Sequence, residues 1–142
     1  MIDVEEGFTV TEVFDTRTLA EAPVISAPDG SAVRPLCVLP GAGSFAHFRL
    51  EPGEIAKAVV HATVQEIWFV VAGDGRMWRR QEGREDEVDL RPGVCLTIPL
   101  GTEFQFRSGT VALEVVAATM PPWPVESDDE ARPARGPWQP TF

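Results

Sequence analysis

The sequence predicts an all-β fold of the sandwich or barrel type. Turn signals such as Pro52-Gly53, Pro92-Gly93 and Ser108-Gly109 divide the chain at intervals of roughly 8–12 residues, which is the spacing of such folds. The segments between the turns are rich in β-branched and aromatic residues, and no long 3.6-residue period runs through the chain. Only residues 18–21 indicate a helical turn. Strands are expected at residues 8–13, 33–39, 45–50, 66–71, 76–80, 94–98, 103–107 and 111–118.

Length and charge indicate one globular domain that works without nucleic acid or a membrane. The chain has 142 residues, 44% of them hydrophobic and 24% charged, which is enough to bury a core. Its formal net charge of −10 repels phosphate backbones and anionic lipids, so we expect neither partner. No apolar run approaches the roughly 20 residues that span a bilayer. The N-terminus also lacks the basic and apolar regions of a signal peptide.

The two cysteines, Cys37 and Cys95, lie far apart in apolar, strand-like segments and show no CxxC spacing. This usage favours buried, reduced thiols over a disulfide. We therefore expect a cytoplasmic protein.

Changes in composition divide the chain into three parts. Residues 1–32 are expected to form an N-terminal arm with short strands, and residues 33–119 the barrel. Residues 120–142 are rich in proline and acidic residues, and such a density of proline does not fit a central strand. Because this tail also carries Trp123 and Trp138, we expect an extended strap that packs on the barrel rather than a disordered end.

Two motifs bounded by glycine carry the candidate polar residues. In the first, Gly53 is followed by His61, then by Glu66, and six residues separate Glu66 from Gly73. The stretch between Glu66 and Gly73 is strand-like, so the glycine marks the turn at its end. This motif places one imidazole and one carboxylate within a few residues of each other.

The second motif consists of Gly93, Pro99 and Gly101, followed by Phe104 and Ser108. Together the two motifs resemble the signature motifs of the cupin family, over residues 34–119. The resemblance implies a double-stranded β-helix, which is the cupin or jelly-roll barrel, and a homodimer. It also implies an interior site that often holds a metal.

Several ligand positions of the family's motifs hold other residues in this chain. The first motif usually has two histidines, and Val59 stands where the first of them is expected. In the second motif, Phe104 takes the histidine position and Ser108 the asparagine position. The scaffold residues of the motifs are therefore present, whereas two of the metal-binding histidines are not.

Strand alternation predicts which side chains face the barrel interior. If Glu66 points inward, so does Trp68; if His61 points inward, Val59 and Thr63 accompany it. On the opposite wall two phenylalanines face inward, which leaves Glu103 and Gln105 outside. The predicted ligand pocket is therefore lined by His61, Glu66, Val59, Thr63, Trp68, Phe104 and Phe106.

The ligand count favours a barrel without a metal. Catalytic sites normally use at least three protein ligands, and the motifs supply only His61 and Glu66. A hydrogen-bonded pair of these two side chains is the simpler interpretation. If a divalent metal such as Fe, Mn, Ni or Zn is bound, a third ligand must be recruited, with His47 or Glu103 the main candidates and Gln65 or Gln105 further ones.

Three functions remain open at this point. The first is the binding of a small organic molecule in the barrel interior, where His61 and Glu66 supply the polar contacts. The second is a metal-dependent cupin enzyme of the isomerase, cyclase or dioxygenase type, which the family resemblance implies. The third is a structural or regulatory module with a filled barrel. The ligand count favours the first over the second, and no catalytic residue is assigned.

Overall fold

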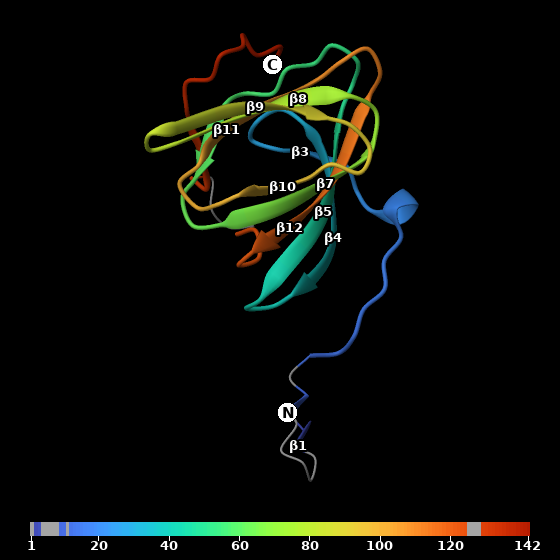
Figure 1. Ribbon diagram of the computed structural model, residues 1–142. Helices are drawn as coiled ribbons and strands as arrows, with labels where there is room; N and C mark the ends of the chain where they lie inside the picture. The colour runs from blue at the N-terminus through green and yellow to red at the C-terminus, as the bar shows by residue number, and fades with distance from the viewer. Residues whose placement is uncertain (1, 4–8, 11, 125–128) are drawn as a thin grey trace.

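Two antiparallel β-sheets face each other and enclose the core (Figure 1). The computed structural model describes residues 2–3, 9–10, 12–124 and 129–142. The six-stranded sheet has the order β10 (Cys95–Ile98), β7 (Gln65–Ala72), β12 (Leu113–Met120), β5 (Gly43–Leu50), β4 (Ala32–Leu39), β3 (Ile25–Ser26). The five-stranded sheet has the order β13 (Ala131–Pro133), β6 (Val59–His61), β11 (Glu103–Ser108), β8 (Gly75–Gln81), β9 (Arg84–Leu90). This architecture is the jelly-roll barrel that the sequence predicts.

The N-terminal pair of strands lies away from these two sheets (Figure 1). Strand β1 (Ile2–Asp3) pairs with β2 (Thr9–Val10), and the short 3-10 turn η1 spans Leu19–Glu21. The guanidinium of Arg34 donates a hydrogen bond of 2.9 Å to the carbonyl oxygen of Leu19 and so joins this segment to β4. The helical turn expected near residue 19 is confirmed. Within the described ranges, no helix has the length and apolar character needed to cross a bilayer.

The core follows the two-residue alternation of the strands. In β7, Trp68 and Val70 are buried, whereas Ile67 and Phe69 on the opposite face are both 44% exposed. In β12 the odd-numbered side chains are buried in the same way. Each large side chain buried here stabilises the fold by about 1.5–3 kcal/mol, so this alternation fixes which face of the sheet forms the core.

The corner after β7 requires glycine. Gly73 has a φ of 84°, which L side chains rarely adopt. A Cβ atom at this position would also collide with the carbonyl oxygen of Ala112. The glycine that ends the first motif therefore allows two chain segments to approach closely.

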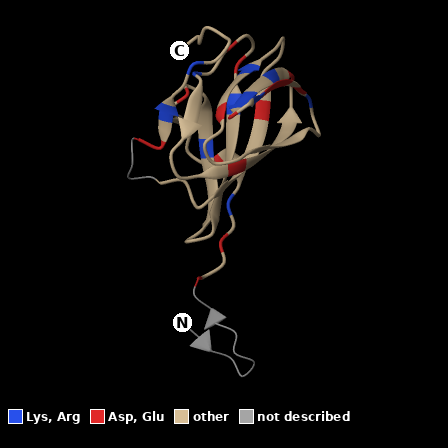
Figure 2. Cartoon of the chain, turned by 60° about the vertical axis from the view of Figure 1, so that its left-hand side comes forward, with Lys and Arg blue, Asp and Glu red and all other residues tan. Residues whose placement is uncertain are grey.

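Strand β9 is missing from the sequence-based assignment because its residues are mostly charged. It is an edge strand that pairs with β8, and only Leu90 is fully buried. Arg76 Nη1 contacts Asp89 at 2.5 Å, and Arg79 Nη2 contacts Asp86 at 2.8 Å. Figure 2 shows positive and negative residues side by side on this hairpin. Cross-strand ion pairs, rather than an apolar face, accompany the pairing.

The C-terminal segment packs on the outer face of the five-stranded sheet. Strand β13 pairs with β6, and the backbone N–H of Thr141 donates to the carbonyl oxygen of Ile55. The expectation that Gln105 faces solvent is wrong, because this segment buries it completely. Its amide nitrogen donates to the carbonyl oxygens of Ala56 and Trp138, at 2.8 and 2.9 Å.

Both cysteines are free in the structure, but the expected burial holds for neither. Cys37 is half-buried and Cys95 is exposed. Cys95 lies on the edge strand β10 opposite Phe69, on the outer face of the six-stranded sheet. The apolar residues around Cys95 are those that alternate with it and point inward, whereas Cys95 itself points outward.

Candidate functional site

A cavity of about 150 Å³ lies between the two sheets. Strands of both sheets contribute to its walls, together with the loop that follows β3 and the segment that follows β12. Most lining residues are apolar. The lining consists of Ile25, Ala27, Asp29, Val33, Pro35, Leu36, Val38, Ser44, Phe45, Ala46, Phe48, Val59, His61, Glu66, Trp68, Phe104, Thr119, Trp123 and Ala131.

Five of the seven residues predicted to line the pocket do so. Val59 and His61 come from β6, Glu66 and Trp68 from β7, and Phe104 from β11. Phe104 is paired with Val59 in the antiparallel register, so both side chains emerge on the same face of the sheet. The alternation read from the sequence is therefore correct on three strands from two sheets.

Thr63 and Phe106 do not line the cavity. Strand β6 ends at His61, so the alternation stops there, and Thr63 is exposed in the following turn. Its hydroxyl donates to the carboxylate of Glu130. Phe106 does face inward, but it lies deeper in the core, with its ring centroid 4.9 Å from that of Trp68.

His61 presents an unpartnered nitrogen inside the barrel. The side chain is 6% exposed. Its Nδ1 is buried and has no hydrogen-bond partner among the described residues, unlike the other buried side-chain nitrogen and oxygen atoms of those residues. The nearest carboxylate oxygen is Glu66 Oε1, at 3.9 Å, which is too far for a hydrogen bond. The imidazole is held between Phe104 and Trp123, at ring-centroid distances of 5.1 and 5.2 Å.

Glu66 is buried and receives hydrogen bonds from neutral groups. Its Oε1 accepts from Trp68 Nε1 at 3.0 Å, and its Oε2 accepts from the hydroxyl of Thr119 at 2.7 Å. The residue is only 3% exposed. The expected hydrogen bond between His61 and Glu66 is therefore absent from the structure. One donor on the same strand, Trp68, and one on the neighbouring strand β12, Thr119, orient the carboxylate instead.

A second carboxylate, that of Asp29, lines the same cavity. Its Oδ1 accepts hydrogen bonds from the backbone N–H and the hydroxyl of Ser31, at 2.9 and 2.7 Å. Burial raises the pKa of the Asp29 carboxyl group, although the hydrogen bonds from Ser31 act in the opposite direction. The sequence shows Asp29 only as part of a Pro-Asp-Gly turn, so no local signal could have found it.

Trp123 is a second cavity residue that the sequence analysis did not predict. It follows β12 in the segment that leads toward the C-terminal strap, and its backbone N–H donates to the hydroxyl of Ser44 at 3.0 Å. Its ring meets His61 edge-on, with an interplanar angle of 80°. The C-terminal segment thus has two roles. Trp123 forms part of one wall of the cavity, and the described residues after it cover the outer face of the five-stranded sheet.

Comparison with known families identifies the fold family. The family described as "Cupin domain" matches residues 46–118, which is about half of the chain. This protein belongs to the cupin family. A search of curated proteins finds no match.

Solved structures similar to this cupin support the fold. The capsular polysaccharide assembling protein CapF from Staphylococcus aureus superposes with a TM-score of 0.59 and 17% identity, over 68% of this chain and 30% of its own. A variant of Bacillus subtilis oxalate decarboxylase superposes with a TM-score of 0.68 and 16% identity, over 83% of this chain and 32% of its own. The structure of Drosophila melanogaster CENP-C bound to CAL1 superposes with a TM-score of 0.63 and 15% identity, over 72% of this chain and 82% of the matched chain. The chain thus spans about 30% of the length of CapF, and identities this low show the fold alone.

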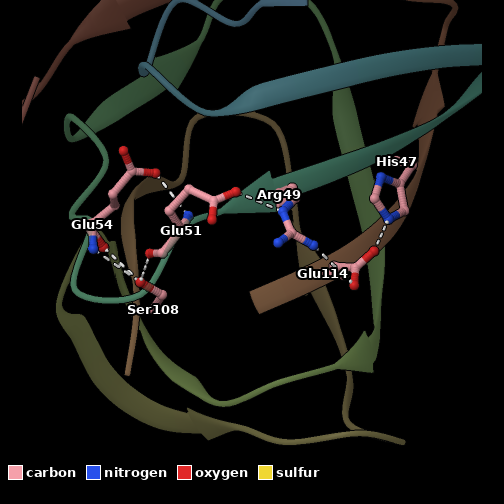
Figure 3. Close-up of polar contacts among 6 residues, drawn as sticks. All are labelled: His47, Arg49, Glu51, Glu54, Ser108 and Glu114. Atoms are coloured by element: carbon pink, nitrogen blue, oxygen red, sulfur yellow. Dashed lines mark hydrogen bonds and ion pairs between the residues drawn. The ribbon is translucent and has the colours of Figure 1, made fainter. Parts of the chain in front are cut away.

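The described residues of this cupin do not form a metal site. Among the described residues, no group of three or more His, Cys, Asp and Glu side chains lies close enough to hold one. His47 cannot join His61, because it lies on the outer face of the six-stranded sheet, where Nε2 contacts Glu114 Oε1 at 2.8 Å (Figure 3).

The other candidate third ligands also lie outside the cavity. Glu103 is on the outer face of the five-stranded sheet, where its Oε2 accepts from Arg80 at 2.6 Å. Gln65 is exposed and Gln105 lies under the strap. Ser108, at the asparagine position of the second motif, donates to the carbonyl oxygens of Glu51 and Glu54 (Figure 3). The cavity is lined by His61, Glu66 and Asp29, but among the described residues these side chains do not lie close enough together to hold a metal ion.

Proposed function

We propose that this cupin binds a small organic molecule in the cavity between its sheets, without a metal. The observation that carries the proposal is the unpartnered Nδ1 of His61. A buried polar atom without a hydrogen bond costs about 1–3 kcal/mol, and a ligand with a matching group removes this cost. An apolar enclosure with a few polar groups is also the usual composition of a small-molecule site.

The cavity limits the size of the molecule. Its volume of about 150 Å³ is comparable to that of an engineered protein cavity that binds benzene. Phe48, Trp68 and Phe104 supply ring surfaces around it. A molecule with one ring, or an aliphatic body of similar size, and one polar group that reaches His61 meets these requirements.

The test compares the two histidines of the chain, using benzyl alcohol as a neutral probe in an NMR titration. His61→Leu removes the unpartnered nitrogen, whereas His47→Leu alters a histidine on the outer face of the sheet. We expect binding by the wild type and the His47 variant, and at least about tenfold weaker binding by the His61 variant. Equal binding by all three proteins would overturn the role assigned to His61.

Metal content provides an independent test. The proposal expects far less than one divalent ion per chain in protein purified without a chelator or a histidine tag. Near-stoichiometric Fe, Mn, Ni or Zn, lost in a His61→Ala variant, would overturn it in favour of a metal-dependent cupin.

We also propose that the protein forms a homodimer through the outer face of the six-stranded sheet. Ile67, Phe69 and Val71 of β7 are 43–44% exposed there, and Phe45 of β5 is 41% exposed. Val116 and Ala118 of β12 lie between these strands in the sheet order. A continuous apolar face of this kind is typical of an interaction surface. Sedimentation analysis that gives a monomer mass at all concentrations would contradict the dimer.

A further inference from the structure

Two carboxyl groups line the cavity, and the lining residue beside them that can carry positive charge is His61, whose electrostatic effect lowers the pKa of Asp29 against the larger effect of burial. Among the described residues that line the cavity with Asp29 and Glu66, none is a lysine or an arginine. Both residues are buried, at 8% and 3% exposure, and carboxylates are rarely buried so deeply without a cationic partner. The hydrogen bonds to both carboxylates come from neutral donors, namely hydroxyls, an indole N–H and a backbone N–H.

Among the described residues, no hydrogen bond joins His61 Nδ1 to either carboxylate. Its Nδ1 stands 3.9 Å from Glu66 Oε1, whereas a charged imidazolium bonded to a carboxylate would approach to about 2.7–2.9 Å. In the tautomer with its proton on Nε2, Nδ1 accepts a hydrogen bond from a donor in the cavity. A group that both carries positive charge and donates N–H bonds would satisfy the imidazole and a carboxylate together.

The remaining walls are also suited to a cation. The rings of Phe48 and Trp68 are stacked, with centroids 5.7 Å apart and an interplanar angle of 10°. Phe104 stands at 80° to Trp68, and Trp123 closes another side. Aromatic faces attract cations, and the attraction is strongest where water is excluded. The net charge of −10 additionally favours the approach of positive ligands over negative ones.

We propose that the ligand of this site is a small organic ammonium ion, a protonated amine with an apolar body. The inference rests on the proposed function and adds the chemical class of the ligand. The ammonium group donates to His61 Nδ1 and lies near the carboxylates of Asp29 and Glu66. The apolar body contacts the aromatic walls.

The test compares three probes of nearly equal shape, namely benzylamine, benzyl alcohol and benzoate. They are cationic, neutral and anionic at pH 7, and each is titrated into the full chain by NMR at physiological salt. We expect benzylamine to bind at least about tenfold more tightly than benzyl alcohol, and benzoate not to bind. Stronger or equal binding of benzyl alcohol would overturn the charge inference and leave the proposed function standing. If none of the three probes binds, both proposals are wrong.

Two variants test whether the preference for benzylamine over benzyl alcohol arises from the carboxylates of the cavity. Glu66→Gln keeps an acceptor for the Trp68 indole N–H and places an NH₂ group against Thr119, whose hydroxyl then accepts instead of donating. Asp29→Asn keeps an acceptor for Ser31, so each variant removes charge with little change in shape. Each should weaken benzylamine binding by about tenfold and change benzyl alcohol binding by less than about threefold.

Glu103→Gln is the matched control, because it removes the same charge from the outer face of the other sheet. It should leave the affinity for both probes unchanged. If it weakens benzylamine binding as much as Glu66→Gln does, the attraction comes from the overall charge of the protein and the assignment to the cavity is wrong. Asp29→Asn keeps the test decisive if Glu66→Gln fails to fold.

Discussion

Glu130 should be one of the most sensitive polar positions for stability. The residue is 2% exposed, and its carboxylate accepts hydrogen bonds from the hydroxyl and backbone N–H of Thr63 and from the backbone N–H of Val64. These bonds join the C-terminal segment to the turn between β6 and β7, directly after His61. Loss of this carboxylate therefore loosens both the strap and one wall of the cavity.

The size of the effect follows from the number of bonds. In Glu130→Gln, the amide oxygen takes the Oε2 position and still accepts from both backbone N–H groups, whereas the NH₂ group faces the Thr63 hydroxyl, which then accepts instead of donating. The variant therefore keeps the bonds but removes the charge of their acceptor. A hydrogen bond to a charged acceptor contributes about 1.5–3 kcal/mol. Because three bonds to a charged acceptor become bonds to a neutral amide, the free energy of unfolding should fall by about 1–3 kcal/mol at pH 7.

The same effect should depend on pH. Burial by itself raises the pKa of Glu130, but the hydrogen bonds from Thr63 and Val64 outweigh it and hold the pKa below its ordinary value of 4.5. A lowered pKa in the folded state contributes stability that is present above pH 4.5 and is lost as the pH falls through the folded pKa. The difference between wild type and Glu130→Gln should therefore shrink on acidification.

Urea unfolding at pH 7 and at several acidic values measures both quantities. Glu103→Gln serves as the control, because its ion pair with Arg80 is about one-third exposed and such pairs contribute at most about 1 kcal/mol. A Glu130 variant that loses less than about 0.5 kcal/mol at pH 7, or whose deficit does not change with pH, would refute the reasoning.

Three further changes have definite expected outcomes. Asp29→Asn should raise the free energy of unfolding at pH 7 by about 0.5–2 kcal/mol, because burial raises the pKa of this carboxyl above 3.8. In urea unfolding, this gain in stability should vanish below pH 3.8. A variant that is less stable than the wild type at pH 7 would contradict the prediction. Phe104→His should confer one Zn²⁺ or Ni²⁺ per chain in calorimetry, since Phe104 lines the cavity with His61 and Glu66; no binding would show that the three positions do not converge. Phe69→Glu should convert a dimer into a monomer in sedimentation experiments, and an unchanged dimer would exclude this face.

Much of the site could be predicted because its residues lie on regular strands. The alternation of β6, β7 and β11 correctly places His61, Trp68 and Phe104 at the cavity. It fails for Thr63, because β6 ends two residues earlier. The failure for Gln105 has another cause: alternation predicts which face of a sheet a side chain occupies, but not whether a distant segment covers that face.

The sequence alone determined the type of fold and the positions of its turns, because glycine, proline and two-residue alternation act over a few neighbouring residues. It also determined that two histidine positions of the cupin motifs hold Val59 and Phe104. Only the tertiary structure decided that Asp29 and Trp123 line the cavity and that His47 lies outside it. It also decided that Nδ1 of His61 has no hydrogen-bond partner within the described part of the chain. These facts depend on contacts between segments far apart in the chain, and local physical chemistry does not specify which distant segments meet.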